Sequence, residues 1–162
     1  MNQLIDTHER LLDETGWRIL QALQEDARIS YAELGRRVGL TPPAVQERVK
    51  RLEEAGIIKG YHAQIDLKRV GASVMAFIRI SDTGKHFDRV GELLKAMPAV
   101  LEMHHVLGED CYVVKVAVPS VAALESFFRE VKPYAHTTTS IVVQSPIQRR
   151  TICMDIADEP EY

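Results

Sequence analysis

The chain of 162 residues predicts an α+β protein made of two small domains. Residues 1–60 contain short amphipathic helices with a tight turn between the last two, typical of a helix-turn-helix domain of the winged-helix type. Residues 74–150 follow the order strand, helix, strand, strand, helix, strand, typical of a ferredoxin-like βαββαβ domain. Between the two domains we expect an extended linker over residues 61–73, and after them an acidic tail over residues 151–162.

The ends of the two paired helices are marked by local signals. Ser30 and Glu33 form a capping box at the start of the first helix, and Gly39 is the left-handed residue expected at its end. Thr41 is a good N-cap for the second helix, and Pro42 suits its first position, where an N–H group is not needed. The second helix therefore begins only a few residues after the first one ends.

Apolar residues at helical spacing predict a three-helix core. In the second paired helix the apolar stripe is Val45, Val49, Leu52 and Ala55. Gly56 closes this helix, and we expect a strand to start at residues 56–58. An earlier helix, capped by Asp13, would complete the core. Its apolar positions are Leu12, Trp17, Ile19, Leu20 and Leu23.

The polar face of the second paired helix predicts contact with DNA. A helix-turn-helix places this helix in the major groove, with residues near the helix start at base edges and flanking cations on phosphates. For positioning and base edges we expect Thr41, Pro43, Gln46 and Glu47. For phosphates we expect Arg48, Lys50 and Arg51, with Arg36 and Arg37 in the same basic patch. An ordinary helical hairpin with a solvated charged face is the alternative.

The charge of the chain predicts more than one copy on DNA. A formal net charge of −3 argues against a protein that coats nucleic acid through bulk positive charge. Residues 35–59 nevertheless contain six cations and three acids, which is a local excess of three positive charges. Because one such patch binds DNA weakly, we expect a homodimer that presents two patches to successive major grooves.

The rest of the composition predicts a cytoplasmic protein without a metal or cofactor. Its 46% of hydrophobic and 27% of charged residues are ordinary for a globular protein, and neither a signal peptide nor a membrane-spanning run is recognisable. Cys111 and Cys153 lie far apart and belong to no paired-cysteine motif. His104 and His105 point to opposite faces of a strand, so they cannot easily share one metal ion.

In the second half the strands and helices leave one sheet face without a partner. Strands are expected at 74–80, 100–106, 111–118 and 137–144, and helices at 87–97 and 121–131. In a βαββαβ domain both helices cover the same face of the sheet. Because the other face would carry apolar residues from several strands, we expect the same face of a second copy to cover it.

The whole pattern resembles the Lrp/AsnC family of bacterial and archaeal feast/famine transcription regulators. The residues that carry the resemblance are LDETGWRILQALQEDARISYAELGRRVGLTPPAVQERVKRLEEAGIIKGY, HHVLGEDCYVVKVAVPS and TTTSIVVQSPI. The resemblance implies a sequence-specific DNA-binding regulator with a RAM-type C-terminal domain. It also implies a homodimer that often assembles further, to rings or octamers, and whose assembly and DNA affinity respond to an amino acid or a related metabolite.

The resemblance further implies an effector pocket between dimers, at the turn joining the second and third strands and at the facing last strand. The matching turn residues are His105, Val106, Leu107, Gly108, Glu109, Asp110, Cys111 and Tyr112, and their neighbours are Thr137, Thr138, Thr139 and Ser140. Asp110 or Glu109 would accept from an ammonium group, and backbone N–H groups and threonine hydroxyls would donate to a carboxylate. Some family members have an acid in place of Cys111. A plain hairpin is the alternative for this turn.

Two other functions are compatible with this pattern. An architectural protein of the same build would wrap or bridge DNA without a ligand, and the departure from the family at Cys111 favours this alternative. An enzyme would need a convergent acid, base or nucleophile, but strand alternation separates Asp110, His104 and Cys111. Since the sequence also lacks a glycine-rich phosphate loop and a nucleophile elbow, we expect no enzymatic activity.

Overall fold

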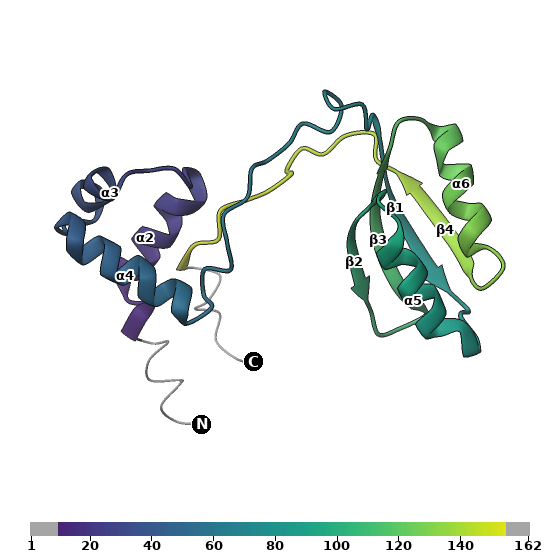
Figure 1. Ribbon diagram of the computed structural model, residues 1–162, viewed down its shortest axis with the longest axis horizontal. Helices are drawn as coiled ribbons and strands as arrows, with labels where there is room; N and C mark the ends of the chain where they lie inside the picture. The colour runs from purple at the N-terminus through teal and green to yellow at the C-terminus, as the bar shows by residue number, and fades with distance from the viewer. Residues whose placement is uncertain (1–9, 155–162) are drawn as a thin grey trace. The chain divides into compact units, whose positions relative to one another are not determined.

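The computed structural model describes residues 10–154, which divide into two compact units (Figure 1). Of the described residues, the first unit contains 10–63 and 147–154, and the second contains 64–146. Among the described residues, no helix is long and apolar enough to cross a membrane.

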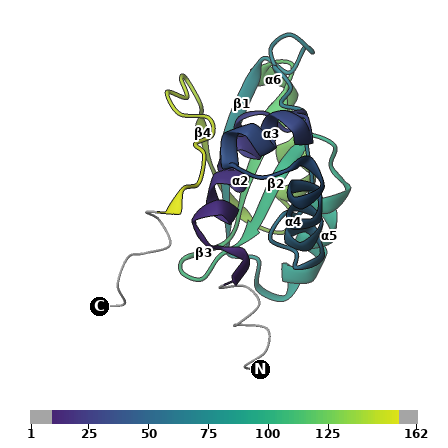
Figure 2. The same ribbon diagram turned by 90° about the vertical axis from the view of Figure 1, so that its left-hand side faces the viewer.

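Three helices surround the core of the first unit in its described part (Figure 2). They are α2 (Glu14–Glu25), α3 (Tyr31–Val38) and α4 (Pro42–Glu54). The most deeply buried side chains are Ile19, Leu34, Val45, Val49 and Leu52. Each comes from a stripe of helically spaced apolar residues, and burying each one contributes about 1.5–3 kcal/mol to the unit's stability.

The expected side-chain cap forms at α2 and in part at α3, whereas Thr41 at the start of α4 makes no side-chain capping bond. The side chain of Asp13 accepts a hydrogen bond at 2.7 Å from the backbone N–H three residues later, and Ser30 does the same at 3.2 Å. The carboxylate of Glu33, however, pairs with Arg36 and Arg37. Only the Ser30 half of the capping box is therefore present.

The strand expected at residues 56–58 does not form. The backbone N–H groups of Ile57 and Ile58 donate to the carbonyl oxygen of Leu52, at 3.0 and 3.1 Å. Gly56 has a positive φ of 70°, which turns the chain back over the last turn of α4. These bonds use the N–H groups that a strand ladder would need, and the two isoleucines pack against the helical core instead.

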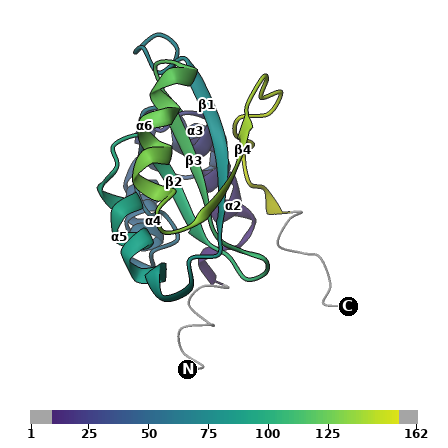
Figure 3. The ribbon, with the colours of Figure 1, turned by 90° about the vertical axis from the view of Figure 1, so that its right-hand side faces the viewer.

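The second unit is a four-stranded antiparallel sheet with helices on one face (Figure 3). Its strands are β1 (Val74–Ser81), β2 (Val100–His105), β3 (Asp110–Val118) and β4 (His136–Ile141). Its helices are the short 3₁₀ helix η1 (Gly84–His86), α5 (Phe87–Ala96) and α6 (Val121–Val131). The strands lie side by side in the order β2-β3-β1-β4, and every neighbouring pair is antiparallel. This confirms the predicted βαββαβ arrangement.

Strand alternation gives the sheet one covered face and one face that we call the open face. On the covered side, Ile78 and Val114 pack with Leu94 of α5 and Phe127 of α6. By strand register, the open face is formed by Met75, Phe77, Arg79, Glu102, His104, Val113, Lys115, Ala117, Thr138 and Ser140. Phe77 remains 42% exposed there, so the described part of this unit does not cover the apolar centre of its own sheet.

The segment of residues 147–154 belongs to the first unit, which no sequence pattern indicated. Gln24 of α2 donates from Nε2 to the carbonyl oxygen of Ile152 and accepts at Oε1 from the N–H of Ile152, both at 3.0 Å. One side-chain amide thus satisfies both backbone groups of one residue. The first unit is therefore built from two separate parts of the chain.

We expect the substitution Gln24→Leu to release Ile152 from α2. The variant loses both hydrogen bonds to Ile152, each with a net contribution of about 0.5–1.5 kcal/mol, and also the bond from Gln24 to the carbonyl oxygen of Leu20. Amide hydrogen exchange at Ile152 should accelerate, by roughly tenfold for every 1.4 kcal/mol lost. Gln24→Glu keeps the acceptor and should give an intermediate rate. Unchanged exchange at Ile152 in Gln24→Leu would show that the amide does not hold this segment.

Candidate nucleic-acid interface and effector site

One exposed face of α4 carries most of the residues expected at DNA. Pro43, Gln46, Glu47 and Lys50 follow one another at spacings of three, one and three, so they lie on the same side of the helix. This side is opposite the buried stripe. The exposed candidates are Thr41, Pro43, Gln46, Glu47, Lys50 and Arg51. Thr41 occupies the N-cap position without a side-chain capping bond, which leaves its hydroxyl available.

Two cations of α4 are paired with acids of the same helix. Lys50 Nζ lies 3.5 Å from Glu54 Oε1, and Arg51 Nε lies 2.9 Å from Glu47 Oε1. Both pairs are exposed and join residues one helical turn apart, so each contributes only about 0.3–0.5 kcal/mol to the stability of the helix. A phosphate group can therefore replace either acid at little cost.

The two arginines of α3 are paired in the same way. Arg37 lies 3.4 Å from Glu33 and 3.7 Å from Glu25, and Arg36 also contacts Glu33. These side chains are on the surface of the first unit. They add positive potential beside α4, but their acidic partners reduce it.

Arg48 differs from the other cations of α4. Its Nη2 lies 2.6 Å from Asp13 Oδ1, and its side chain is 27% exposed, against 64% for Lys50 and 62% for Arg51. Burial alone would raise the pKa of Asp13, but the hydrogen bonds from Arg48 and Gly16 and the charge of Arg48 hold it below the ordinary value of 3.8. The guanidinium expected at a phosphate is thus bound to the start of α2.

The turn between β2 and β3 exposes the expected effector residues His105, Leu107, Gly108 and Glu109, and Tyr112 is buried. His105 and Tyr112 lie opposite each other across the two strands. The N–H of Val106 donates to the carbonyl oxygen of Cys111 at 3.2 Å, which closes the turn. Leu107 at its tip is 98% exposed. Gly108, with a φ of 142°, adopts a backbone conformation that other residues rarely occupy.

An acid, a cation and a hydroxyl come together near this turn. Arg79 Nη1 lies 3.7 Å from Asp110 Oδ2, and on its other side Arg79 is in register with Thr138 of β4. Nothing in the sequence singled out Arg79, because a lone cation in an apolar strand does not reveal which strands flank it. Arg79, Asp110 and Thr138 therefore form a polar cluster with groups suited to both ends of an amino acid.

Three of the other expected residues, Thr137, Thr139 and Cys111, do not share the face of this polar cluster. Thr137 and Thr139 face Ile80 and Ile78 and so lie on the helix side of the sheet, whereas Ser140 lies on the open face. Cys111 is the extra residue at a register shift between β1 and β3. Its Sγ lies 3.3 Å from the hydroxyl of the buried Thr83.

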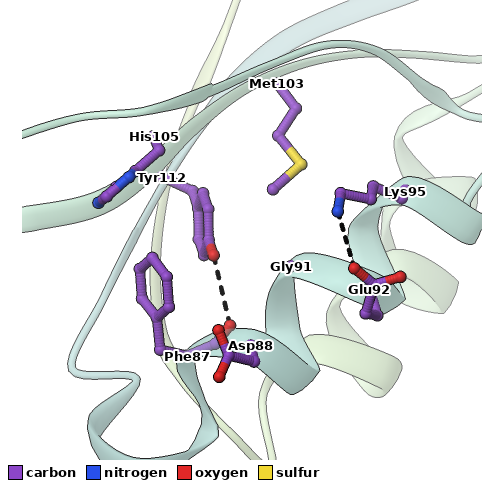
Figure 4. A pocket seen from close by; sticks show the side chains of 8 residues that line it. All are labelled: Phe87, Asp88, Gly91, Glu92, Lys95, Met103, His105 and Tyr112. Carbon is purple, nitrogen blue, oxygen red and sulfur yellow. Dashed lines mark hydrogen bonds and ion pairs between the residues drawn. The ribbon is translucent and has the colours of Figure 1, made fainter.

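A pocket of about 390 Å³ lies between α5 and the β2–β3 pair (Figure 4). It is lined by Phe87, Asp88, Gly91, Glu92, Lys95, Met103, His105 and Tyr112. Only His105 and Tyr112 were expected at an effector site. Because α5 is an ordinary amphipathic helix in sequence, no motif marked its exposed residues as part of a pocket.

The walls of this pocket are largely occupied by contacts within the unit. The ring of Phe87 stacks on Tyr112 at 4.8 Å between centroids, and Lys95 Nζ donates to Glu92 at 2.7 Å. At the base, a Cβ on Gly91 would lie 2.9 Å from the Tyr112 hydroxyl oxygen, so a glycine is needed there. Burial, followed by the charge of Asp88, raises the pKa of Tyr112 above 10. In the described part of the chain, no group of three potential ligands could hold a metal ion.

Both halves of the chain match known protein families. Residues 12–59 match the winged helix-turn-helix DNA-binding model, and residues 75–152 match the Lrp/AsnC ligand binding domain. The HTH-type transcriptional regulator LrpC of Bacillus subtilis (strain 168) is 34% identical over 131 residues, which are 81% of this chain and 91% of that protein. The leucine-responsive regulatory protein of Escherichia coli (strain K12) is 33% identical over 144 residues, which are 85% of this chain and 88% of that protein.

Solved structures share the fold over most of the chain. LrpC of B. subtilis gives a TM-score of 0.80 at 32% identity and covers 85% of this chain and 99% of its own. Regulator NMB0573 of Neisseria meningitidis, in complex with L-Met, gives a TM-score of 0.79 at 28% identity. It covers 90% of this chain and 99% of its own. The feast or famine regulatory protein Rv3291c of M. tuberculosis, complexed with L-methionine, gives a TM-score of 0.78 at 31% identity. It covers 87% of this chain and 99% of its own.

Proposed function

Because the chain belongs to the Lrp/AsnC family of DNA-binding transcription regulators, we propose that it recognises specific sites as a homodimer and that an amino acid bound by the second unit alters this recognition. The chain is a regulator with a ligand-binding domain and is not an enzyme. The observation that carries the proposal is the exposed polar face of α4 on a chain whose other unit matches a ligand-binding domain.

In the proposed complex α4 enters the major groove with its N-terminal half toward the bases. Gln46 can bond adenine through both the oxygen and the nitrogen of its side-chain amide, and Glu47 can accept from a cytosine amino group. Lys50 and Arg51 reach phosphates by exchanging Glu54 and Glu47 for phosphate oxygens. Arg36 and Arg37 of α3 add phosphate contacts at the side of the groove.

A second copy of the chain is the proposed partner of the open face. Phe77 and its neighbours Met75 and Val113 form an apolar centre, which Lys115 and Glu102 flank with an ion pair at 2.8 Å. An apolar centre with a polar margin is the usual composition of a protein interface. The fully exposed Leu107 at the β2–β3 turn supports a further association of dimers, to an octamer, with the effector bound between them.

The polar cluster of Arg79, Asp110 and Thr138 is the proposed centre of effector binding. Asp110 accepts from the ammonium group, and Arg79 can bind the carboxylate through two parallel hydrogen bonds. Thr138 adds a hydroxyl on the neighbouring strand. Two structurally similar relatives hold L-methionine, which supports an amino acid as the ligand class. Glu109 and the backbone N–H groups of the turn complete the site.

One observation favours a ligand-independent architectural protein instead. Arg79 and Asp110 are already paired at 3.7 Å, so the two charges that would hold an amino acid neutralise each other without it. Such a protein would bind many DNA fragments with a weak sequence preference and would ignore amino acids.

The two classes of DNA contact predict different effects of substitution. Lys50→Ala should weaken binding to all sequences and reduce the slope of log K against log salt concentration by about one, because one phosphate contact is lost. Gln46→Ala should instead reduce discrimination at particular base pairs, by about 1–3 kcal/mol, with little change in slope. Fluorescence anisotropy with specific and scrambled duplexes at several salt concentrations measures both. An unchanged slope for Lys50→Ala would remove Lys50 from the phosphate contacts.

A thermal-shift screen with the twenty amino acids tests the effector. A ligand at 100 times its Kd stabilises the folded state by about 2.7 kcal/mol, so at least one amino acid should raise the Tm and change DNA affinity. Asp110→Asn should abolish that shift. Thr139→Val, on the helix side of the same sheet, is the matched control and should retain it. If no amino acid changes either Tm or DNA affinity, the effector role is wrong and the architectural alternative stands.

A further inference from the structure

We infer that Asp13 and Arg48 form a latch that sets the orientation of α4 on α2, so that Arg48 supports DNA recognition by positioning the reading helix and not by contacting a phosphate. The inference rests on the proposed DNA contacts of α4. It assigns Asp13, an acid outside the expected interface, a role in DNA recognition.

The Asp13 end of the latch is fixed to the backbone of α2. Asp13 is the N-cap of this helix, and its Oδ1 accepts both from the Gly16 N–H at 2.7 Å and from Arg48 Nη2 at 2.6 Å. The turn before the helix is tight, since a Cβ on Gly16 would lie 1.9 Å from the carbonyl oxygen of Leu11. The acceptor therefore has little freedom to follow Arg48 if α4 moves.

The ion pair of Arg48 joins α4 to another helix. The pairs of Lys50 and Arg51 connect residues of α4 itself, so they cannot fix the helix relative to its neighbours. Asp13 and Arg48 are 35 residues apart and connect the start of α2 with the middle of α4. Within α2, Arg18 donates to the carbonyl oxygen of Arg37 near the end of α3. Directional bonds thus hold α2 to both helices of the helix-turn-helix.

A directional bond can fix the rotation of α4 about its own axis, which the apolar core alone cannot do. Val45, Val49 and Leu52 hold α4 in the core, but apolar burial is not directional and tolerates small rotations of a helix about its axis. Base readout does not tolerate them, because hydrogen bonds weaken steeply when distance and angle change. Arg48 lies beside the buried stripe and one or two residues from Glu47 and Gln46. A rotation that breaks the latch would therefore displace the two base-edge candidates.

The latch and a direct phosphate contact predict opposite effects of neutralising Asp13. If Arg48 bound phosphate, Asp13→Asn would remove a negative charge and free the guanidinium, so DNA affinity would rise. If the latch positions α4, the same change weakens specific binding. Asparagine is as good an N-cap as aspartate, so Asp13→Asn keeps the start of α2 and alters mainly the bond to Arg48.

A double-mutant cycle on the full-length protein tests the latch. The variants are Asp13→Asn, Arg48→Met, their combination and the conservative Arg48→Lys, with Arg69→Met as a control that removes an exposed ion pair with Asp66. We expect each single variant to weaken specific binding by roughly threefold to tenfold and the double variant to be no weaker than Arg48→Met. The salt slope and binding to scrambled DNA should not change, and Arg48→Lys should restore part of the loss.

Three results would overturn the latch. These are stronger binding by Asp13→Asn, a salt slope reduced by about one in Arg48→Met, or additive losses in the double variant. Circular dichroism and Tm measured on every variant identify unfolding, and the near-isosteric Asp13→Asn keeps the test decisive if Arg48→Met is unstable. A wild-type protein that does not prefer specific over scrambled DNA would contradict the proposed function itself, before any variant is compared.

Discussion

The charge balance of the DNA-binding unit is the constraint on which the rest of the structure depends. Lys50 and Arg51 each share their charge with an acid one turn away, and the whole chain has a net charge of −3. Because affinity for DNA increases with the number of phosphates neutralised, we expect one copy of this unit to bind weakly. We propose that specific binding comes from repetition of the unit at a fixed spacing and from accurate placement of α4 within each copy.

In this proposal the second unit provides both the dimer interface and the site where an effector binds. Alternation in β1 and β3 buries Ile78 on one side and leaves Phe77 on the other, so one strand pair supplies both the core and the open face on which we propose a second copy. The chain that leaves β4, which carries Thr138, continues to Ile152 on α2. The strand that we propose contacts the effector is therefore followed directly by a segment bonded to the DNA-binding unit.

Local sequence signals predicted the elements well, because caps and periodicity are properties of neighbouring residues. The prediction of a strand at residues 56–58 was wrong for a local reason. Isoleucines favour strands, but the positive φ of Gly56 turns the chain so that the N–H groups of Ile57 and Ile58 donate to the carbonyl oxygen of Leu52. Contacts between distant residues were beyond prediction. Helical spacing predicts that Arg48 lies outside the buried stripe of α4, but it does not identify Asp13 as the partner of Arg48. Likewise, the bond between Gln24 and Ile152 joins residues 128 positions apart.

The most direct test of whether DNA recognition needs two copies of the first unit is to measure the Phe77→Asp variant by sedimentation velocity and by DNA titration. A charge at the centre of the open face should give a monomer with an intact first unit. Its affinity for a duplex with two half-sites should fall roughly a hundredfold or more, with half the salt slope of the wild type. Val121→Asp, on the exposed start of α6, is the control and should remain dimeric. A Phe77→Asp protein that stays dimeric, or that binds as a monomer with undiminished affinity, would contradict this account.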